Sequence, residues 1–217
     1  MQDAVNLGLI PARGGSRGVR RKNIRHLAGR PLIEYTICAA LASGNLTDVV
    51  VSTEDAEIAG LARGLGANVP FMRPPELATG SADALCVVRH AVDWYERCVA
   101  PVSAVAVLYA TSPFRTAGHI EDAFRVLDET GAQEVLTVTE LSHDHPGWAL
   151  RLGPDGRARR WDPSINACRR QDLPPAYAPN GAIYLFRREA LPELDELLQC
   201  PDAVIMPLDG PAAVNID

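Results

Sequence analysis

Residues 6–24 have the sequence NLGLIPARGGSRGVRRKNI, in which a short aliphatic run is followed by a basic loop with three closely spaced glycines. The aliphatic run at residues 6–10 is typical of a buried strand, which Pro11 ends. Pro31 then opens a helical pattern over residues 32–43. This order of strand, loop and helix is the unit from which α/β sheets are built.

The same alternation continues along most of the chain. Aliphatic runs separated by amphipathic segments are typical of strands that helices cover on both sides. We expect strands at residues 48–52, 67–71, 103–109, 134–139, 182–186 and 204–206, a helix that ends at residue 65, and helices at residues 81–97, 119–130 and 189–199. Ser52 or Thr53 is a suitable N-cap for the first of these helices. The sequence therefore predicts an α/β fold with a mainly parallel sheet and helices on both faces.

The alternation fails between residues 141 and 179, a stretch rich in proline and glycine. Two short apolar pieces can pair there as a hairpin over the Asp-Gly turn at 155–156. The large apolar side chains of this stretch, Trp148 and Trp161 among them, are too scattered for a core of their own. We therefore expect a single domain over residues 1–217, with an insertion at about 141–179 that packs against a second copy of the chain in a homodimer.

Charge and composition exclude several classes of protein. The chain has 217 residues, of which 47% are hydrophobic, and a net charge of −6. No apolar run approaches the roughly 18 residues that span a bilayer, and the first ten residues lack the pattern of a signal peptide. An acidic chain is not expected to coat nucleic acid, and its five cysteines have no metal-binding spacing, so reduced and mostly buried thiols are expected. We expect a soluble, cytoplasmic protein without nucleic-acid or membrane partners.

Positive charge gathers in the glycine-rich loop and its surroundings. Residues 1–30 contain seven basic residues and one acidic residue, a local charge of +6. Glycines let backbone N–H groups approach an anion while arginines neutralise it, so this loop is expected to hold a phosphate chain; a tight turn with solvated arginines is the alternative. The spacing fits neither GxxxxGKS/T nor GxGxxG. Lys22 is the only lysine among 21 basic residues, which indicates a position that needs a compact ammonium group.

The segment IPARGGSRGVRRKNI and the following LAGRPLIEYTI resemble the sugar-acid cytidylyltransferases, the enzymes that make CMP-activated sialic acid and its relatives. Further matches follow in order: VVVSTEDAEIA, VPFMRPPELA, VLYATSPFRT, RRQDLPPAYAPNGAIYLF and VNID. The resemblance covers nearly the whole chain. It implies a Rossmann-like nucleotidyltransferase fold, CTP as substrate, Mg²⁺ as cofactor, and a homodimer in which the insertion of one subunit reaches the active site of the other.

The resemblance also implies roles for individual residues. The nucleotide is expected to contact Ala12, Arg13, Gly14, Gly15, Ser16, Arg17, Lys22, Asn23, Arg73 and Ser81. The sugar acid is expected at Tyr109, Arg170, Asn180 and Tyr184, with Arg170 receiving its carboxylate. Asn215 and Asp217 match the metal-binding pair, and Asp217 is expected to hold most of the Mg²⁺ because an amide is the weaker ligand. Arg13, Lys22 and Asp217 are then the catalytic residues.

The implied reaction is attack of the anomeric hydroxyl of a 2-keto-3-deoxy sugar acid on the α-phosphorus of CTP. Tyr109 stands where the sialic acid enzymes commonly carry glutamine, and LYATSPF is close to the pseudaminic acid branch. The acceptor is therefore open between a sialic acid-like sugar, pseudaminic or legionaminic acid, and a phosphonate. An alternative of another class, a nucleotide-binding protein with little turnover, is motivated by the amide of Asn215.

Overall fold

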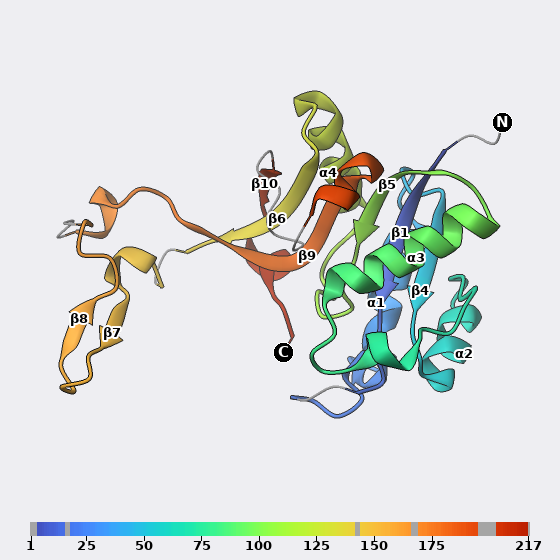
Figure 1. The fold of residues 1–217 in the computed structure, drawn as a ribbon, viewed down its shortest axis with the longest axis horizontal. Helices are drawn as coiled ribbons and strands as arrows, with labels where there is room; N and C mark the ends of the chain where they lie inside the picture. The colour runs from blue at the N-terminus through green and yellow to red at the C-terminus, as the bar shows by residue number, and fades with distance from the viewer. Residues whose placement is uncertain (1–3, 16–17, 142–143, 166–168, 195–202, 217) are drawn as a thin grey trace.

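The computed structural model describes residues 4–15, 18–141, 144–165, 169–194 and 203–216. Within these residues, six strands form one sheet in the order β10-β6-β9-β5-β1-β4 (Figure 1). β1 pairs in parallel with β4 and β5, and β10 with β6, whereas β9 runs antiparallel to β5 and β6. The strands are β1 (Val5–Pro11), β4 (Asp48–Ser52), β5 (Val102–Val107), β6 (Glu134–Glu140), β9 (Tyr177–Arg187) and β10 (Ala203–Pro207). The expected mainly parallel sheet is confirmed, with β9 as its antiparallel member.

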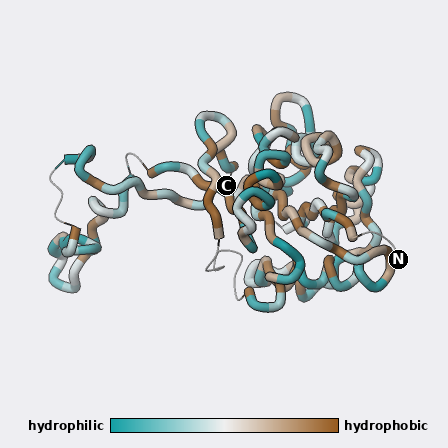
Figure 2. The backbone as a smooth tube through the Cα atoms, turned by 90° about the horizontal axis from the view of Figure 1, so that it is seen from above, coloured by the Kyte–Doolittle hydropathy of each residue, from teal (hydrophilic) through white to brown (hydrophobic). Residues whose placement is uncertain are grey.

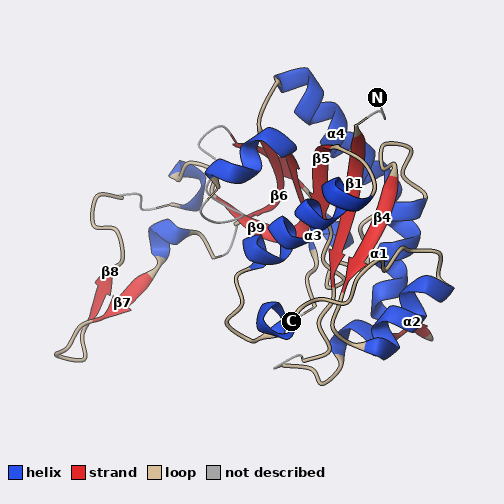
Figure 3. Ribbon diagram, turned by 45° about the vertical axis from the view of Figure 1, so that its right-hand side comes forward, coloured by secondary structure: helices blue, strands red, loops and turns tan. Residues whose placement is uncertain are grey.

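Helices cover both faces of this sheet (Figure 3). One face carries α1 (Leu32–Leu41), α2 (Ala56–Gly64) and α4 (Ala117–Thr130), and the other carries α3 (Ala84–Cys98). β5 contributes to both cores in turn, because successive side chains of a strand point to opposite faces. Ala106 packs into the first core and Val107 into the second. The predicted layers of helix, sheet and helix are confirmed.

Two expectations for the region after β4 differ from the structure. The helix after β4 is capped by Asp55, whose side chain accepts hydrogen bonds from the N–H groups of Glu57 and Ile58, and not by Ser52 or Thr53. The strand expected at residues 67–71 is reduced to one bridge between Val50 and Asn68; Pro70 lacks the N–H that a longer ladder needs.

The helix expected at residues 189–199 is wrong where the structure describes it. Residues Arg188–Glu193 form the 3-10 helix η5, which contains Pro192. The proline lacks an N–H and clashes with the preceding turn, so an α-helix cannot continue through it. Residues 195–199 lie outside the described part of the chain.

An arm leaves the sheet between β6 and β9 and stands clear of the rest of the molecule (Figures 1 and 2). Its strands β7 (Leu150–Leu152) and β8 (Ala158–Arg160) form the predicted hairpin, with Gly156 at a φ of 75° in the turn. The expected insertion ends three residues too late, because residues 177–179 already pair with β6 as the start of β9. β9 begins at Tyr177, before the aliphatic run at residues 182–186 from which the strand was predicted, so the sequence pattern did not include these three residues.

Shorter elements complete the described part of the chain. Two-residue strands β2 (His26–Leu27) and β3 (Arg30–Pro31) pair with each other before α1. The 3-10 helices besides η5 are η1 (Lys22–Ile24), η2 (Pro75–Ala78), η3 (Pro146–Trp148), η4 (Arg170–Asp172) and η6 (Gly210–Ala213).

Two expectations from composition can be compared with these elements. Among the described residues, no helix combines the length and the apolar character needed to cross a membrane. Cys38, Cys86 and Cys98 are free thiols, but all three are exposed, so the expectation of buried thiols is wrong for them. They lie on α1 and α3 at positions between the buried ones, where the helix faces solvent.

Candidate functional site

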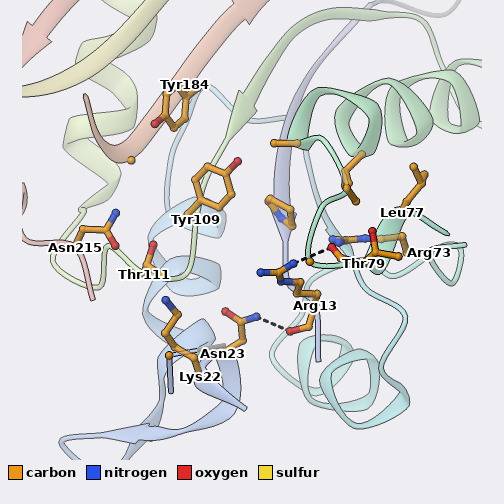
Figure 4. A pocket seen from close by; sticks show the side chains of 17 residues that line it. Arg13, Lys22, Asn23, Arg73, Leu77, Thr79, Tyr109, Thr111, Tyr184 and Asn215 are labelled. Atoms are coloured by element: carbon orange, nitrogen blue, oxygen red, sulfur yellow. Dashed lines mark hydrogen bonds between the residues drawn. The ribbon is translucent and has the colours of Figure 1, made fainter. Parts of the chain in front are cut away.

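A cavity of about 660 Å³ opens where β1 and β5 end (Figure 4). The chain runs from β1 to β4 on one side of β1 and then crosses to β5 on its other side, so the strand order reverses between β1 and β5. In open α/β sheets, ligands bind at the carboxyl ends of strands at such a reversal. The lining residues are Pro11, Arg13, Gly18, Lys22, Asn23, Arg73, Leu77, Thr79, Gly80, Ala82, Ala84, Val87, Tyr109, Thr111, Gly181, Tyr184 and Asn215.

The basic loop supplies the cationic wall of this cavity. Arg13 donates from Nη1 to the backbone oxygen of Thr79 at 2.9 Å, and Asn23 donates from Nδ2 to the backbone oxygen of Arg13 at 2.9 Å (Figure 4). Arg21 has a φ of 54° and turns away to α2, where it pairs with Asp55 at 3.1 Å. This left-handed residue starts η1, which brings Lys22 and Asn23 to the cavity. The structure therefore brings Arg13, Lys22 and Asn23 together at one cavity, and their contact with a nucleotide stays a prediction.

The other loop residues have different surroundings. The N–H of Gly14 donates to Oε1 of Glu54 at 2.7 Å, so in this structure it is engaged by a side chain of the protein and is not open to a ligand. A Cβ at Gly14 would lie 2.5 Å from Oδ2 of Asp55, so a larger residue there would require Asp55 to move. Ala12 is fully buried beneath the loop and Gly15 is exposed. Ser16 and Arg17, also predicted to bind the nucleotide, lie outside the described residues.

Arg73 forms the part of the cavity wall next to Arg13 (Figure 4). Its side chain is only 5% exposed and donates to Oγ of Ser52 at 3.0 Å and to the backbone oxygen of Ser52. Burial lowers the pKa of Arg73, an effect opposed by the nearby carboxylate of Glu54. Ser81 is exposed and is not among the lining residues, whereas its neighbours Thr79, Gly80 and Ala82 line the cavity.

Two tyrosines line the cavity on the side of β9. The rings of Tyr109 and Tyr184 meet edge to face, with their centroids 5.9 Å apart. Burial raises the pKa of Tyr109 to about 12 and also raises that of Tyr184, so both phenols are neutral at neutral pH. Neither hydroxyl bonds to another described residue, which leaves both available to a ligand. Both tyrosines were predicted sugar contacts, and the structure brings them together.

Asn180, a predicted sugar contact, is not among the lining residues, and its side chain is hydrogen-bonded within the fold. Its Oδ1 accepts hydrogen bonds from Oγ1 of Thr137 at 2.7 Å and from the N–H of Ala182 at 3.1 Å. These bonds stabilise an irregularity in the pairing of β6 with β9 and place Gly181, at a φ of 75°, on the cavity wall. Of the sequence motif at residues 180–184, the structure therefore places Gly181 and Tyr184 on the cavity wall.

The chain returns to the cavity near its end. Asn215 donates from Nδ2 to the backbone oxygen of Asn180 at 3.0 Å, and the N–H of Ile216 donates to the backbone oxygen of Thr111 at 2.8 Å. The backbone oxygen of Asn180 can only accept a hydrogen bond, so the atom of the Asn215 amide that faces it must be the nitrogen. The side-chain oxygen of Asn215 accepts no hydrogen bond from the described residues. The other predicted metal ligand, Asp217, lies outside the described residues.

Arg170 is not brought to this cavity. It begins η4 in the arm, which stands away from the sheet of its own chain (Figure 1).

Sequence reasoning missed the lining residues Thr79 and Thr111. Thr111 could have been found, because it follows the most strand-like run and the carboxyl ends of parallel strands form sites. Thr79 follows no strand, and its loop carries no comparable signal.

Comparison with known proteins decides the family. A sequence model described as cytidylyltransferase matches residues 7–208. The chain belongs to the cytidylyltransferase family. It is 32% identical over 212 residues to a pseudaminic acid cytidylyltransferase of Campylobacter jejuni, covering 98% of this chain and 90% of the relative. It is 35% identical over 183 residues to an N-acylneuraminate cytidylyltransferase of Streptococcus agalactiae, covering 83% of this chain and 43% of that protein.

A solved structure supports the fold of this cytidylyltransferase. The structure of CMP:2-keto-3-deoxy-manno-octonic acid synthetase complexed with CTP superposes with a TM-score of 0.67. The superposition covers 94% of this chain and 91% of that one, at 16% sequence identity. The predicted nucleotidyltransferase fold is confirmed.

Proposed function

We propose that this cytidylyltransferase transfers CMP from CTP to the anomeric hydroxyl of a 2-keto-3-deoxy sugar acid and releases pyrophosphate. The observation that carries the proposal is the order of groups in the cavity. Arg13 lies between Arg73 and the wall of Tyr109 and Tyr184, and Lys22 lies below the tyrosines beside Asn23 (Figure 4). A triphosphate at the cationic centre would leave one side for a nucleoside and the other for an acceptor.

The chemistry required of the chain is mainly positioning and neutralisation of charge. The anomeric oxygen forms a bond to the α-phosphorus while the bond from that phosphorus to the bridging oxygen breaks, and the β- and γ-phosphates leave as pyrophosphate. Arg13 presents a planar fork and Lys22 a compact ammonium to the charge that gathers on the leaving group. The neutral hydroxyls of Tyr109 and Tyr184 are suited to hydrogen-bond the hydroxyl groups of a sugar.

A magnesium ion is part of the proposal, and the residues present fit it. Mg²⁺ prefers oxygen ligands and is commonly held by one or two protein groups together with substrate phosphates. The oxygen of Asn215 lines the cavity side opposite Arg73, and Asp217 would follow it two residues later. When bound, the ion would neutralise phosphate charge and polarise the attacking hydroxyl.

A homodimer completes the proposal. The arm exposes 64% of Leu150, 79% of Leu152 and 66% of Trp161, too much apolar surface for a hairpin that packs on nothing. A second subunit that covers this surface could also receive Arg170 at its cavity. The cytoplasmic location stays a prediction.

Release of pyrophosphate from CTP with a panel of acids tests the function. The panel contains a sialic acid, pseudaminic acid, legionaminic acid and a phosphonate, with ATP, GTP and UTP as alternative nucleotides. We expect release only with CTP and one or a few of the 2-keto-3-deoxy sugar acids. Release with the phosphonate alone would move the acceptor to another class, and CTP binding without release in any mixture would support a nucleotide-binding protein instead.

A further inference from the structure

Arg115 is a buried arginine that joins three parts of the fold behind the cavity. It is 3% exposed and lies directly before the N-cap of α4. Its Nη1 donates to the backbone oxygens of Ala182 at 2.6 Å and Tyr109 at 3.2 Å, and its Nη2 donates to Oγ1 of Thr36 at 2.6 Å. One guanidinium therefore connects the end of β5, the middle of β9 and α1.

Each of these contacts falls beside a residue of the cavity wall. Tyr109 itself lines the cavity, and Ala182 directly follows Gly181, which also lines it. Oγ1 of Thr36 lies 3.3 Å from the backbone oxygen of Tyr109, so this oxygen is held from two directions. The guanidinium thus sets the distance between the two backbone segments that carry Tyr109 and Tyr184.

Burying the charged guanidinium of Arg115 to make this connection is energetically unfavourable. Burial lowers the pKa of Arg115 to about 9, which still leaves the group charged at neutral pH. Among the described residues, no carboxylate forms an ion pair with it. A buried charge without a counter-ion destabilises a fold relative to well-packed apolar side chains. Stability alone therefore does not account for this residue.

We propose that Arg115 is a positioning residue for the acceptor: its planar fork fixes the backbone of Tyr109 relative to β9 and thereby sets the affinity for the sugar acid. The inference rests on the proposed function, in which Tyr109 and Tyr184 form the acceptor wall. Lysine cannot replace the fork, because one ammonium group cannot reach three acceptors in the same directions. The proposed function places CTP toward Arg13 and Arg73, away from the two tyrosines, so we expect its affinity to depend little on this spacing.

The test compares Arg115→Lys with Arg187→Lys, a matched control. Arg187 also donates to backbone oxygens, those of Ala132 and Leu127 at 3.2 Å each, but it lies at the other end of β9 and lines no part of the cavity. We expect Arg115→Lys to raise the KM for the sugar acid about tenfold, the cost of one hydrogen bond to a charged group, and to leave the KM for CTP within about twofold. Arg187→Lys should change neither constant.

If Arg115→Lys does not fold, Thr36→Val tests the same inference. This variant removes the hydroxyl group that accepts a hydrogen bond from Arg115 and leaves the guanidinium in place. It should raise the KM for the acid by a smaller factor than Arg115→Lys. An unchanged acid KM in the variants that fold, or an equal rise in the KM for CTP, would overturn the inference. If the wild-type protein releases no pyrophosphate with any acid, the proposed function itself is contradicted.

Discussion

Lys22 is the residue at which sequence and structure agree most directly. It is the only lysine of the chain, and it lines the cavity from η1 beside Asn23. Loss of one preorganised group that neutralises transition-state charge costs about 100-fold or more in rate. We expect Lys22→Ala to lose about that much kcat for pyrophosphate release.

Lys22→Arg should also be impaired, though less than Lys22→Ala, because a broad planar fork does not replace a point charge in a crowded loop. Arg25→Ala is the control, since Arg25 belongs to the same basic cluster but is exposed and lines no part of the cavity. Wild-type kinetics in Lys22→Arg would contradict the interpretation of the single lysine.

Gly181 offers a second test at the scale of one residue. A Cβ there would lie 2.8 Å from Nδ2 of Asn215, and its φ of 75° is strained for any other residue. Gly156 has the same φ, but a Cβ on it would meet no atom within 4 Å. Alanine at either position should lower the free energy of unfolding by about 1–2 kcal/mol, measured by urea denaturation.

Only Gly181→Ala should also lower the rate of pyrophosphate release, because only there does the new methyl group displace a residue of the cavity wall. Equal activity in Gly181→Ala and Gly156→Ala would show that the contact with Asn215 has no part in the reaction.

At the scale of elements, the N-terminus of α2 supports the basic loop. Asp55 caps this helix, pairs with Arg21 at 3.1 Å and lies against Gly14. Removing an aspartate N-cap costs about 1 kcal/mol of stability. We expect Asp55→Ala to show that loss in urea denaturation and, in addition, to raise the KM for CTP, because the loop loses its support. Thr116→Ala, which removes the side-chain cap of α4 and changes no lining residue, is the control; an equal KM for CTP in the two variants would contradict the link to the loop.

The elements that could be predicted are those with a strong local pattern. Six strands and four helices follow from aliphatic runs and helical periodicity, and glycine together with charge located the basic loop beside the cavity. The strand at 67–71 and the helix at 189–199 failed because Pro70 and Pro192 removed the backbone donors that longer elements require. The hydrogen bonds of the Asn180 side chain within the fold could not be predicted, because they depend on a register irregularity between β6 and β9 that the sequence does not show. Arg115 was missed because buried arginines follow no periodicity.

At the scale of the whole molecule, the arm predicts a dimer. A double variant, Leu152→Glu with Trp161→Glu, should be monomeric in light scattering at micromolar concentration, because each buried charge would be costly in an apolar interface. The wild-type protein should be a dimer under the same conditions. Val99→Glu, which changes a residue 45% exposed at the end of α3, should remain a dimer. A monomeric wild-type protein would contradict the proposed role of the arm.

The central claim is that this cavity joins CMP to the anomeric oxygen of a sugar acid. The most direct measurement follows that oxygen, using an acid equilibrated in ¹⁸O-labelled water so that its anomeric hydroxyl carries the label. Mass spectrometry of the products after reaction with CTP should find ¹⁸O in the CMP-sugar and none in the pyrophosphate. Label in the pyrophosphate, or a CMP product without label, would contradict attack by the anomeric hydroxyl on the α-phosphorus.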